Sequence, residues 1–275
     1  MLKKYAAALA IWLLFAAIAA GLWLGTGNAF YLFNFLYIGT GLAAGMALYA
    51  QGRAWARNAV QWVVGLYLLA YLGVVRRENM QIEGFWYYLF SGVFEAAVIH
   101  YAVAKIFGPL LFGRGFCGYA CWTAMVLDLL PFKEQQLPRR RWGFARYIVF
   151  ALSLAFVAAL FVLRVPGLSQ VMWVAFLVGN ALYYAAGIAL AFFCRDNRAF
   201  CKYVCPAAVF LRPASRLARL RVRVDADACV HCGKCRRACP MGLDVSDTAR
   251  RGDNAADCIL CLRCVETCPK GALRF

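Results

Sequence analysis

Long apolar stretches alternate with short polar ones along the first three quarters of the chain. Each stretch has about 20 residues, the length that an α-helix needs to cross a bilayer. The pattern therefore predicts a polytopic α-helical membrane protein with about six transmembrane helices. The predicted spans are Tyr5–Trp23, Phe30–Ala50, Val60–Val75, Phe85–Phe107, Phe144–Leu163 and Val171–Phe193.

The last quarter of the chain is less apolar and rich in Arg and Cys. We divide the chain into a transmembrane domain over 1–205, a basic linker over 206–224 and a cysteine-rich domain over 225–275. The linker, PAAVFLRPASRLARLRVRV, mixes Arg with Phe and Leu, which is typical of a segment on the membrane surface. A solvated linker is the alternative, because Pro213 interrupts a helix.

Basic residues between the spans fall mainly on one side of the predicted membrane. By the positive-inside rule, both termini and the cysteine-rich domain face the cytoplasm of a bacterial or archaeal cell, at its cytoplasmic (inner) membrane. Lys3 and Lys4 before the first span also fit a signal peptide, but the later spans fix the same orientation. The basic side has Lys3, Lys4, Arg53, Arg57, Arg114, Lys133, Arg139–Arg141, Arg195, Arg198 and Lys202, and the other side has Arg76, Arg77 and Arg164.

Composition supports a membrane protein, since 64% of the 275 residues are hydrophobic and 16% are charged. The net charge of +17 raises the question of nucleic acid. There is no nucleic-acid fold signature, and the basic residues border apolar spans. We therefore expect the lipid bilayer and an acidic partner, and no nucleic acid.

Eight of the 13 cysteines form two runs in the tail, CVHCGKCRRACP from Cys229 and CILCLRCVETCP from Cys258. Both match C-x2-C-x2-C-x3-C-P, in which the first three cysteines hold one cubane cluster and the fourth reaches the other. The spacing predicts two [4Fe-4S] clusters and a reducing compartment. The expected ligands are Cys229, Cys232, Cys235 and Cys268 for one cluster, and Cys258, Cys261, Cys264 and Cys239 for the other.

A zinc-binding tail is the alternative, but zinc sites do not need the third cysteine and the proline of each run. Residues 225–275 resemble bacterial two-cluster ferredoxins, with nothing missing from the motif. The resemblance implies an α+β ferredoxin domain that carries single electrons. Because the segment is short, its clusters should supply much of its stability.

A second pair of motifs lies in the membrane half, where FCGYAC (116–121) recurs as FCKYVC (200–205). Each copy follows two spans, so this half looks like a duplicated unit. Cysteines at i and i+4 share one helix face, and two such faces meeting at an axis would bring four thiols together. Cys117, Cys121, Cys201 and Cys205 are thus candidate ligands of a third iron–sulfur centre, with a redox-active thiol pair or plain apolar packing as alternatives.

These motifs together resemble the membrane-bound polyferredoxins with C-x3-C-P motifs. That family includes the membrane ferredoxin of nitrate reductase and the C-terminal part of the nitrous oxide reductase maturation regulator. The likeness covers Phe85 to Phe275 and implies an inner-membrane electron carrier. One departure is Trp122, which stands where the family usually has proline.

Three further residues of the membrane half carry candidate chemistry. Glu95 and His100 fall in the fourth predicted span, where ionisable groups often mark proton or quinone sites. An interhelical hydrogen bond is the plainer reading. Cys194 reads as a buried spare thiol, with a ligand or exchange role as the alternative.

The leading interpretation is an electron-transfer subunit that relays single electrons between a cytoplasmic donor, the ferredoxin clusters, the third centre and a quinone or partner redox subunit. No substrate-binding motif indicates a self-contained enzyme. One alternative is a copper reductase or metalloenzyme assembly factor, because thiolates also bind copper(I). The other is a redox sensor.

Overall fold

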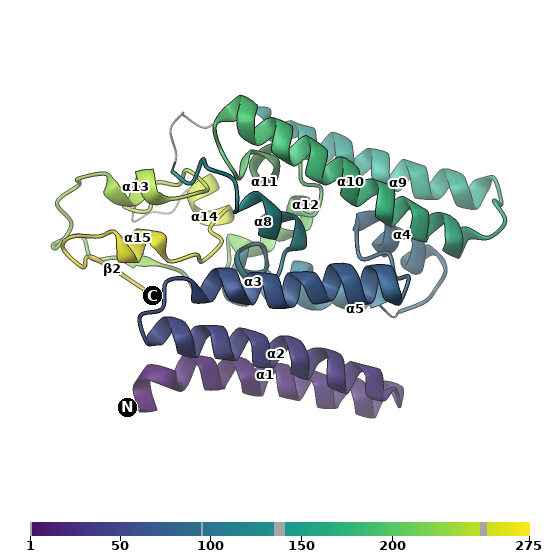
Figure 1. The fold of residues 1–275 in the computed structure, drawn as a ribbon, viewed down its shortest axis with the longest axis horizontal. Coiled ribbons are helices and arrows are strands. Elements are labelled where there is room, and N and C mark those ends of the chain that lie inside the picture. Colours follow the sequence, from purple (N-terminus) through teal and green to yellow (C-terminus); the bar gives the residue numbers. More distant parts are fainter. Residues whose placement is uncertain (1, 95, 135–140, 248–251) are drawn as a thin grey trace.

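The structure is a computed structural model that describes residues 2–94, 96–134, 141–247 and 252–275. Helices lie side by side in an elongated bundle, and the cysteine-rich tail lies at one end of it (Figure 1). Both termini are placed toward this end. We call it the tail end of the bundle and the opposite end the far end.

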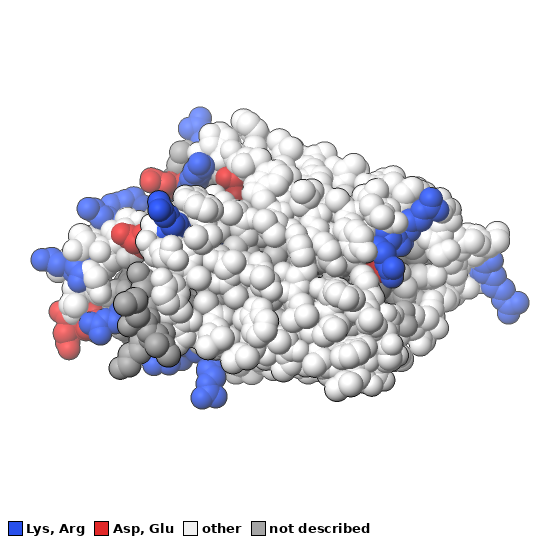
Figure 2. All heavy atoms as spheres, turned by 60° about the horizontal axis from the view of Figure 1, so that its bottom comes forward, with Lys and Arg blue, Asp and Glu red and all other residues white. Residues whose placement is uncertain are grey.

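Five helices of the described chain are long and apolar enough to cross a membrane. Large apolar side chains such as Leu24, Phe33 and Val162 are exposed on them, and Figure 2 shows a broad uncharged surface between charged groups at the two ends. This arrangement is compatible with a multi-pass membrane protein. The five are α1 (Leu2–Thr26), α2 (Ala29–Ala50), α3 (Ala56–Leu66) with its π-helical continuation η1 (Tyr67–Val75), α9 (Ala145–Val162) after the turn η3 (Trp142–Phe144), and α10 (Leu168–Cys194).

The fourth predicted span, Phe85–Phe107, is not one continuous helix. It is divided between α4 (Ile82–Phe90) and a second helical stretch formed by α5 (Ala96–Tyr101), η2 (Ala102–Phe107) and α6 (Gly108–Phe112). Gly92, between them, has a φ of 69°, which ends the first helix. The sequence pattern missed this break because both pieces are apolar. The second stretch leads back to the tail end, so the alternation of the later spans is kept.

The segment before α4, residues 79–81, is buried inside the bundle. Asn79 donates a hydrogen bond to the carbonyl of Met172 in α10 (2.9 Å), and Gln81 packs against Gly179. On the other side, Gly73 in η1 lies in contact with the ring of Phe176. These contacts hold η1 and the segment before α4 against α10.

Two short helix pairs at the tail end carry the repeated motifs. The first motif forms α7 (Gly115–Tyr119) and α8 (Trp122–Leu127), and the second forms α11 (Ala199–Tyr203) and α12 (Ala208–Ser215). α12 begins the predicted linker and is packed against α6 and η2, with Leu211 buried. Leu217 and Leu220, further along the linker, are exposed.

The tail has little regular structure. Strand β1 (Arg223–Val224) pairs antiparallel with β2 (Leu273–Arg274), so the tail unit begins two residues before the predicted boundary. Its helices are α13 (Lys234–Ala238), α14 (Asp253–Ala256) and α15 (Arg263–Glu266). Ile259 and Leu262 of the tail join the same apolar core as Phe116 and Trp122 of the membrane half. The tail is thus packed onto the bundle.

Candidate metal centres

The eight tail cysteines surround two separate cavities. Each cavity takes three cysteines from one run and the fourth from the other, which is the grouping that the sequence predicts. Cys229, Cys232, Cys235 and Cys268 line an outer cavity of about 260 Å³. Cys239, Cys258, Cys261 and Cys264 line an inner cavity beside the membrane half.

Both runs fold in the same way around their cavities. The third and fifth residues of each run have left-handed backbone conformations: His231 and Gly233 in the first run, Leu260 and Leu262 in the second. A left-handed conformation is strained for residues other than glycine and is typical of functional sites. The backbone is therefore bent to turn three nearby thiols inward.

The two cavities differ in their exposure. Cys232 of the outer cavity is exposed, whereas Cys239 and Cys264 of the inner one are buried. Burial raises the pKa of Cys239 to about 12. At Cys268 burial acts the same way, but backbone N–H groups, first that of Lys270, outweigh it and lower the pKa. The cysteines of the outer site are thus more exposed to solvent than those of the inner site.

The four membrane-half cysteines also come together. In both motifs the peptide turns back in the same way, since Cys121 N–H donates to the carbonyl of Phe116 and Cys205 N–H to that of Phe200 (3.0 Å each). The Sγ atoms of these two cysteines each accept a backbone N–H from three residues on, from Ala124 and Ala208. The repeat therefore builds two equivalent halves of one site.

Charge on any of these four thiols acts on the other three. Burial raises the pKa of Cys121 to about 12 and that of Cys201 to about 11, and it also raises that of Cys205. Four thiolates so close would repel one another without a cationic core. In the part of the chain that the structure describes, no three His, Cys, Asp or Glu side chains are close enough to bind a single metal ion.

Two fully buried arginines, Arg114 and Arg198, stand three residues before the first cysteine of each motif. Arg114 Nη2 lies 3.8 Å from Cys117 Sγ and 3.2 Å from the carbonyl oxygen of Cys201. Arg198 Nη1 lies 4.0 Å from Cys201 Sγ and 3.1 Å from the carbonyl oxygen of Cys117. Each guanidinium thus contacts the thiol of its own motif and the backbone of the other.

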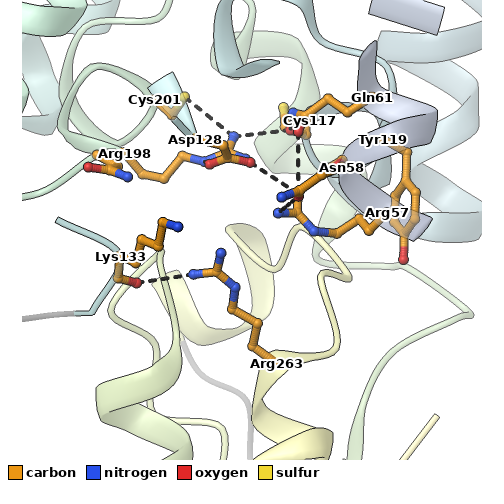
Figure 3. A network of polar contacts seen from close by, with 12 residues as sticks. Arg57, Asn58, Gln61, Cys117, Tyr119, Asp128, Lys133, Arg198, Cys201 and Arg263 are labelled. Carbon is orange, nitrogen blue, oxygen red and sulfur yellow. Dashed lines mark hydrogen bonds and ion pairs between the residues drawn. The ribbon is translucent and has the colours of Figure 1, made fainter. Parts of the chain in front are cut away.

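Each arginine is paired with a carboxylate that also binds a second arginine. Asp128 accepts from Arg198 (2.5 and 2.8 Å) and from Arg57 (3.1 Å), as Figure 3 shows. Asp257 accepts from Arg114 (2.6 Å) and from Arg212. We call these two groups the arginine triads: Arg198, Asp128 and Arg57 form one, and Arg114, Asp257 and Arg212 form the other. The three side chains of each triad, two cations and one anion, add up to a charge of +1 beside the four thiols.

The surrounding protein fits a metal group held by four thiolates. Lys105 adds an ammonium group and, with Arg114, opposes the rise in the pKa of Cys205. Arg114 Nε is buried without a hydrogen-bond partner, and additional sulfur acceptors at this site would satisfy it. Buried positive charge and an unpaired donor both favour an anionic group, such as an iron–sulfur cluster with its thiolates.

The inner tail site is joined to this membrane site by direct contacts. Arg114 N–H donates to the carbonyl of Cys258 (3.2 Å), and the Tyr119 hydroxyl donates to that of Leu260 (3.0 Å). Arg263 of the same run donates to the carbonyl of Lys133 (3.1 Å). The second cysteine run therefore lies directly on the first membrane motif.

The remaining predicted residues have different surroundings. Glu95 lies outside the described residues. His100 is buried against the rings of Phe116 and Trp122, and its Nε2 has no hydrogen-bond partner. Cys194 packs in a separate apolar cluster with Ala199 and Tyr203.

Trp122 stands where the polyferredoxins that the chain resembles usually have proline, and it anchors α8 to α10. Its indole N–H donates to Asn180 Oδ1 (2.8 Å), and its carbonyl accepts from the Tyr184 hydroxyl (3.3 Å). Pro206 takes its place in the second motif. A proline there could not supply the indole N–H that anchors this turn to α10.

Sequence reasoning missed the arginine triads, because it used Arg114 and Arg198 as signs of membrane orientation alone. A signal was present, since the repeat is longer than the hexapeptide: RGFCGYAC at 114–121 and RAFCKYVC at 198–205. The carboxylate partners carry no such signal. Asp128 and Asp257 lie far from their arginines in the chain.

Known iron–sulfur families match both parts of the chain. The family described as "4Fe-4S dicluster domain" matches residues 221–269. The family described as "4Fe-4S binding domain" matches twice, over 97–145 and 181–224. The two matches begin 84 residues apart, the same offset that separates Cys117 from Cys201. The chain carries 4Fe-4S ferredoxin-type domains.

Two curated proteins are similar to this chain. An uncharacterized protein of Methanocaldococcus jannaschii is 28% identical over 214 residues, which are 74% of this chain and 80% of that protein. A protein of Escherichia coli named "Putative electron transport protein YccM" is 26% identical over 171 residues, 55% of this chain and 48% of that protein. This chain thus matches about half the length of YccM. No solved structure matches it.

These matches and the apolar helices support an iron–sulfur electron-transfer role for a protein with membrane helices.

Proposed function

We propose that this protein is a membrane-bound electron carrier with two [4Fe-4S] clusters in its tail and a third iron–sulfur centre held by Cys117, Cys121, Cys201 and Cys205. The observation that carries the proposal is the packed succession of three four-thiol sites, from the outer cavity through the inner cavity to the membrane half. When bound, such clusters accept and release one electron at a time. The protein supplies their spacing and surroundings.

The outer cavity is the proposed place of exchange with a soluble partner. Three cations, Lys234, Arg236 and Lys270, and one carboxylate, Asp244, line it beside the cysteines, so the charged side chains of its lining are mainly positive. Positive charge at the edge of a redox site favours the approach of an acidic partner protein. With the orientation that the basic loops predict, this partner is cytoplasmic.

The membrane end of the path is proposed to meet a quinone or a partner redox subunit. Glu83 Oε2, the Tyr183 hydroxyl and His100 Nε2 are among the buried polar atoms that have no hydrogen-bond partner, and Tyr183 packs in the same cluster as Cys201 and Cys205. The Lys105 ammonium lies beside them, 3.7 Å from the centre of the Tyr101 ring. Ionisable groups at a broken membrane helix are typical of proton or ligand sites.

Iron and sulfide analysis of the anaerobically purified protein tests the proposal. Three cubane clusters require about 12 iron atoms per chain, and the tail alone accounts for about eight. A Cys117→Ala/Cys201→Ala variant should lose about a third of the iron. A variant that retains all of it would contradict the third centre, and fewer than about eight irons would contradict the two tail clusters.

A copper-binding role for the four membrane thiols gains no support from their geometry. Within the described residues, no three potential ligands are close enough for one ion, and this is equally true of the tail cysteines. Metal analysis distinguishes the two proposals, because copper bound stoichiometrically with only about eight irons would favour the copper role.

A further inference from the structure

The two arginine triads are related by the internal repeat, but their carboxylates come from different places. Arg198 is paired with Asp128, which belongs to the first repeat. The equivalent position in the second repeat, 84 residues on, is Arg212, a cation. The second repeat therefore lacks the carboxylate that its own symmetry would supply for Arg114.

The tail provides this missing carboxylate. Asp257 is fully buried, binds both Arg114 and Arg212, and immediately precedes Cys258, an expected ligand of the inner tail cluster. Arg114 in turn reaches both metal sites: its side chain contacts Cys117 Sγ, and its backbone N–H donates to the carbonyl of Cys258.

We propose that Asp257 completes the membrane thiol site from the tail, and that Arg114 and Asp257 are positioning residues that hold the inner tail site against it. This inference rests on the proposed function. It assigns the pair two separable effects, which are docking of the tail and control of the charge beside the membrane centre.

The docking effect follows from burial. If Asp257 loses its charge, Arg114 remains as a fully buried cation without the carboxylate that it binds, a strongly destabilising arrangement, and Arg212 loses its contact with the tail. The least costly relief is for the tail to separate from α7 and admit water. Asp128 serves the same purpose for Arg198 and Arg57, but both of these belong to the bundle.

The charge effect has opposite signs for the two residues. Reduction adds negative charge to a cluster, so nearby positive charge raises the reduction potential and its removal lowers it. Asp257→Asn should therefore raise the potential of the membrane centre, whereas Arg114→Gln should lower it. A purely structural defect would not separate the two variants by sign.

The test uses the full-length, cluster-loaded protein in lipid nanodiscs and compares four variants. Asp257→Asn and Arg114→Gln alter the triad that includes the tail, and Asp128→Asn and Arg198→Gln are the matched controls in the triad confined to the bundle. One readout is the midpoint potential of the membrane centre from a redox titration followed by electron paramagnetic resonance. The other is the rate of tryptic cleavage at the exposed residues Arg216, Arg219 and Arg221.

We expect Asp257→Asn and Arg114→Gln to speed this cleavage by roughly tenfold or more, and the two controls to change it much less. The potential should rise in both Asp→Asn variants and fall in both Arg→Gln variants. Equal cleavage of Asp257→Asn and Asp128→Asn would overturn the docking role. Potential shifts of the same sign in Asp257→Asn and Arg114→Gln would overturn the charge role.

If Asp257→Asn does not accumulate, Arg212→Gln replaces it, since it removes the second cation that Asp257 binds. That variant should lower the potential and speed cleavage, and behaviour identical to the unchanged protein would refute the proposal. Iron analysis separates this failure from failure of the proposed function. If the protein binds about 12 irons per chain and the variants still behave as the unchanged protein, the roles proposed for Arg114 and Asp257 are wrong. If it binds only about eight, the third centre is absent and the proposed function is wrong in that part. The cleavage test decides the docking role in either case.

Discussion

Gly118 in α7 lies in contact with the main-chain carbonyl oxygen of Ile259, so that no side chain fits between the membrane motif and the second cysteine run. The equivalent residue of the second motif is Lys202, which instead pairs with Asp196 inside the bundle (2.6 Å). Gly118 thus distinguishes the first membrane motif, which packs against the tail, from the second, which does not have a glycine at this position.

Gly118→Ala should weaken tail docking by about 1–3 kcal/mol, because the added methyl group overlaps the Ile259 carbonyl. The measurement is tryptic cleavage of the linker together with thermal unfolding in detergent. Gly21→Ala in α1 is the control, since nothing lies within 4 Å of the added carbon. Cleavage as slow as in the unchanged protein would contradict the close packing.

Removal of the iron should unfold the tail and leave the spans helical. The tail has two-residue strands and short helices, so little else holds its loops when the thiols lose their metal. Circular dichroism after chelation should keep most of its helical signal, while residues 225–275 become sensitive to trypsin. A tail that stays resistant without iron would show that its packing on the bundle suffices.

Asp128 should contribute to stability in a pH-dependent way. Burial acts to raise its pKa, but Arg198 and Arg57 outweigh this and hold the pKa below the ordinary value of 3.8. A group with a lowered pKa stabilises the fold above its ordinary pKa, and the contribution is lost as the pH falls through the lowered one.

Thermal unfolding of the unchanged protein should therefore show no change from this group between pH 7 and pH 5, and a loss beginning below about pH 4. Asp128→Asn should be less stable at neutral pH and should show a smaller loss in acid. Asp225→Asn is the control, because its pair with Arg274 is exposed. An acid profile of Asp128→Asn that parallels the unchanged protein would refute the assignment.

Glu83→Gln should slow electron exchange with a quinone in proteoliposomes by roughly tenfold or more, provided that Glu83 moves a proton there. Its iron content should stay unchanged, because Glu83 lies outside the proposed ligand sets. Glu78→Gln, which alters a carboxylate paired with Arg76 near the far end, is the control. Equal rates in both variants would remove Glu83 from the proton path.

The grouping of the tail cysteines around two cavities could be predicted from sequence, because their spacing is local and few other structures share it. The break at Gly92 could not, since mean apolarity over 20 residues is the same for one span and for two packed pieces. The two arginine triads could not be predicted from the sequence either. Asp257 and Arg114 meet only through the fold, and a buried arginine at a loop end looks like an ordinary topology signal.

All 13 cysteines lie at or beyond residue 117, in the tail or at the tail end of the bundle. A membrane voltage acts on charge that moves across the bilayer, at about 2.3 kcal/mol per elementary charge per 100 mV. In the proposed path, electrons that pass among these thiol sites would stay near one face of the membrane, so the voltage would neither drive nor oppose them appreciably. Energy conservation at this protein would have to come from protons or from another carrier that crosses to the far end.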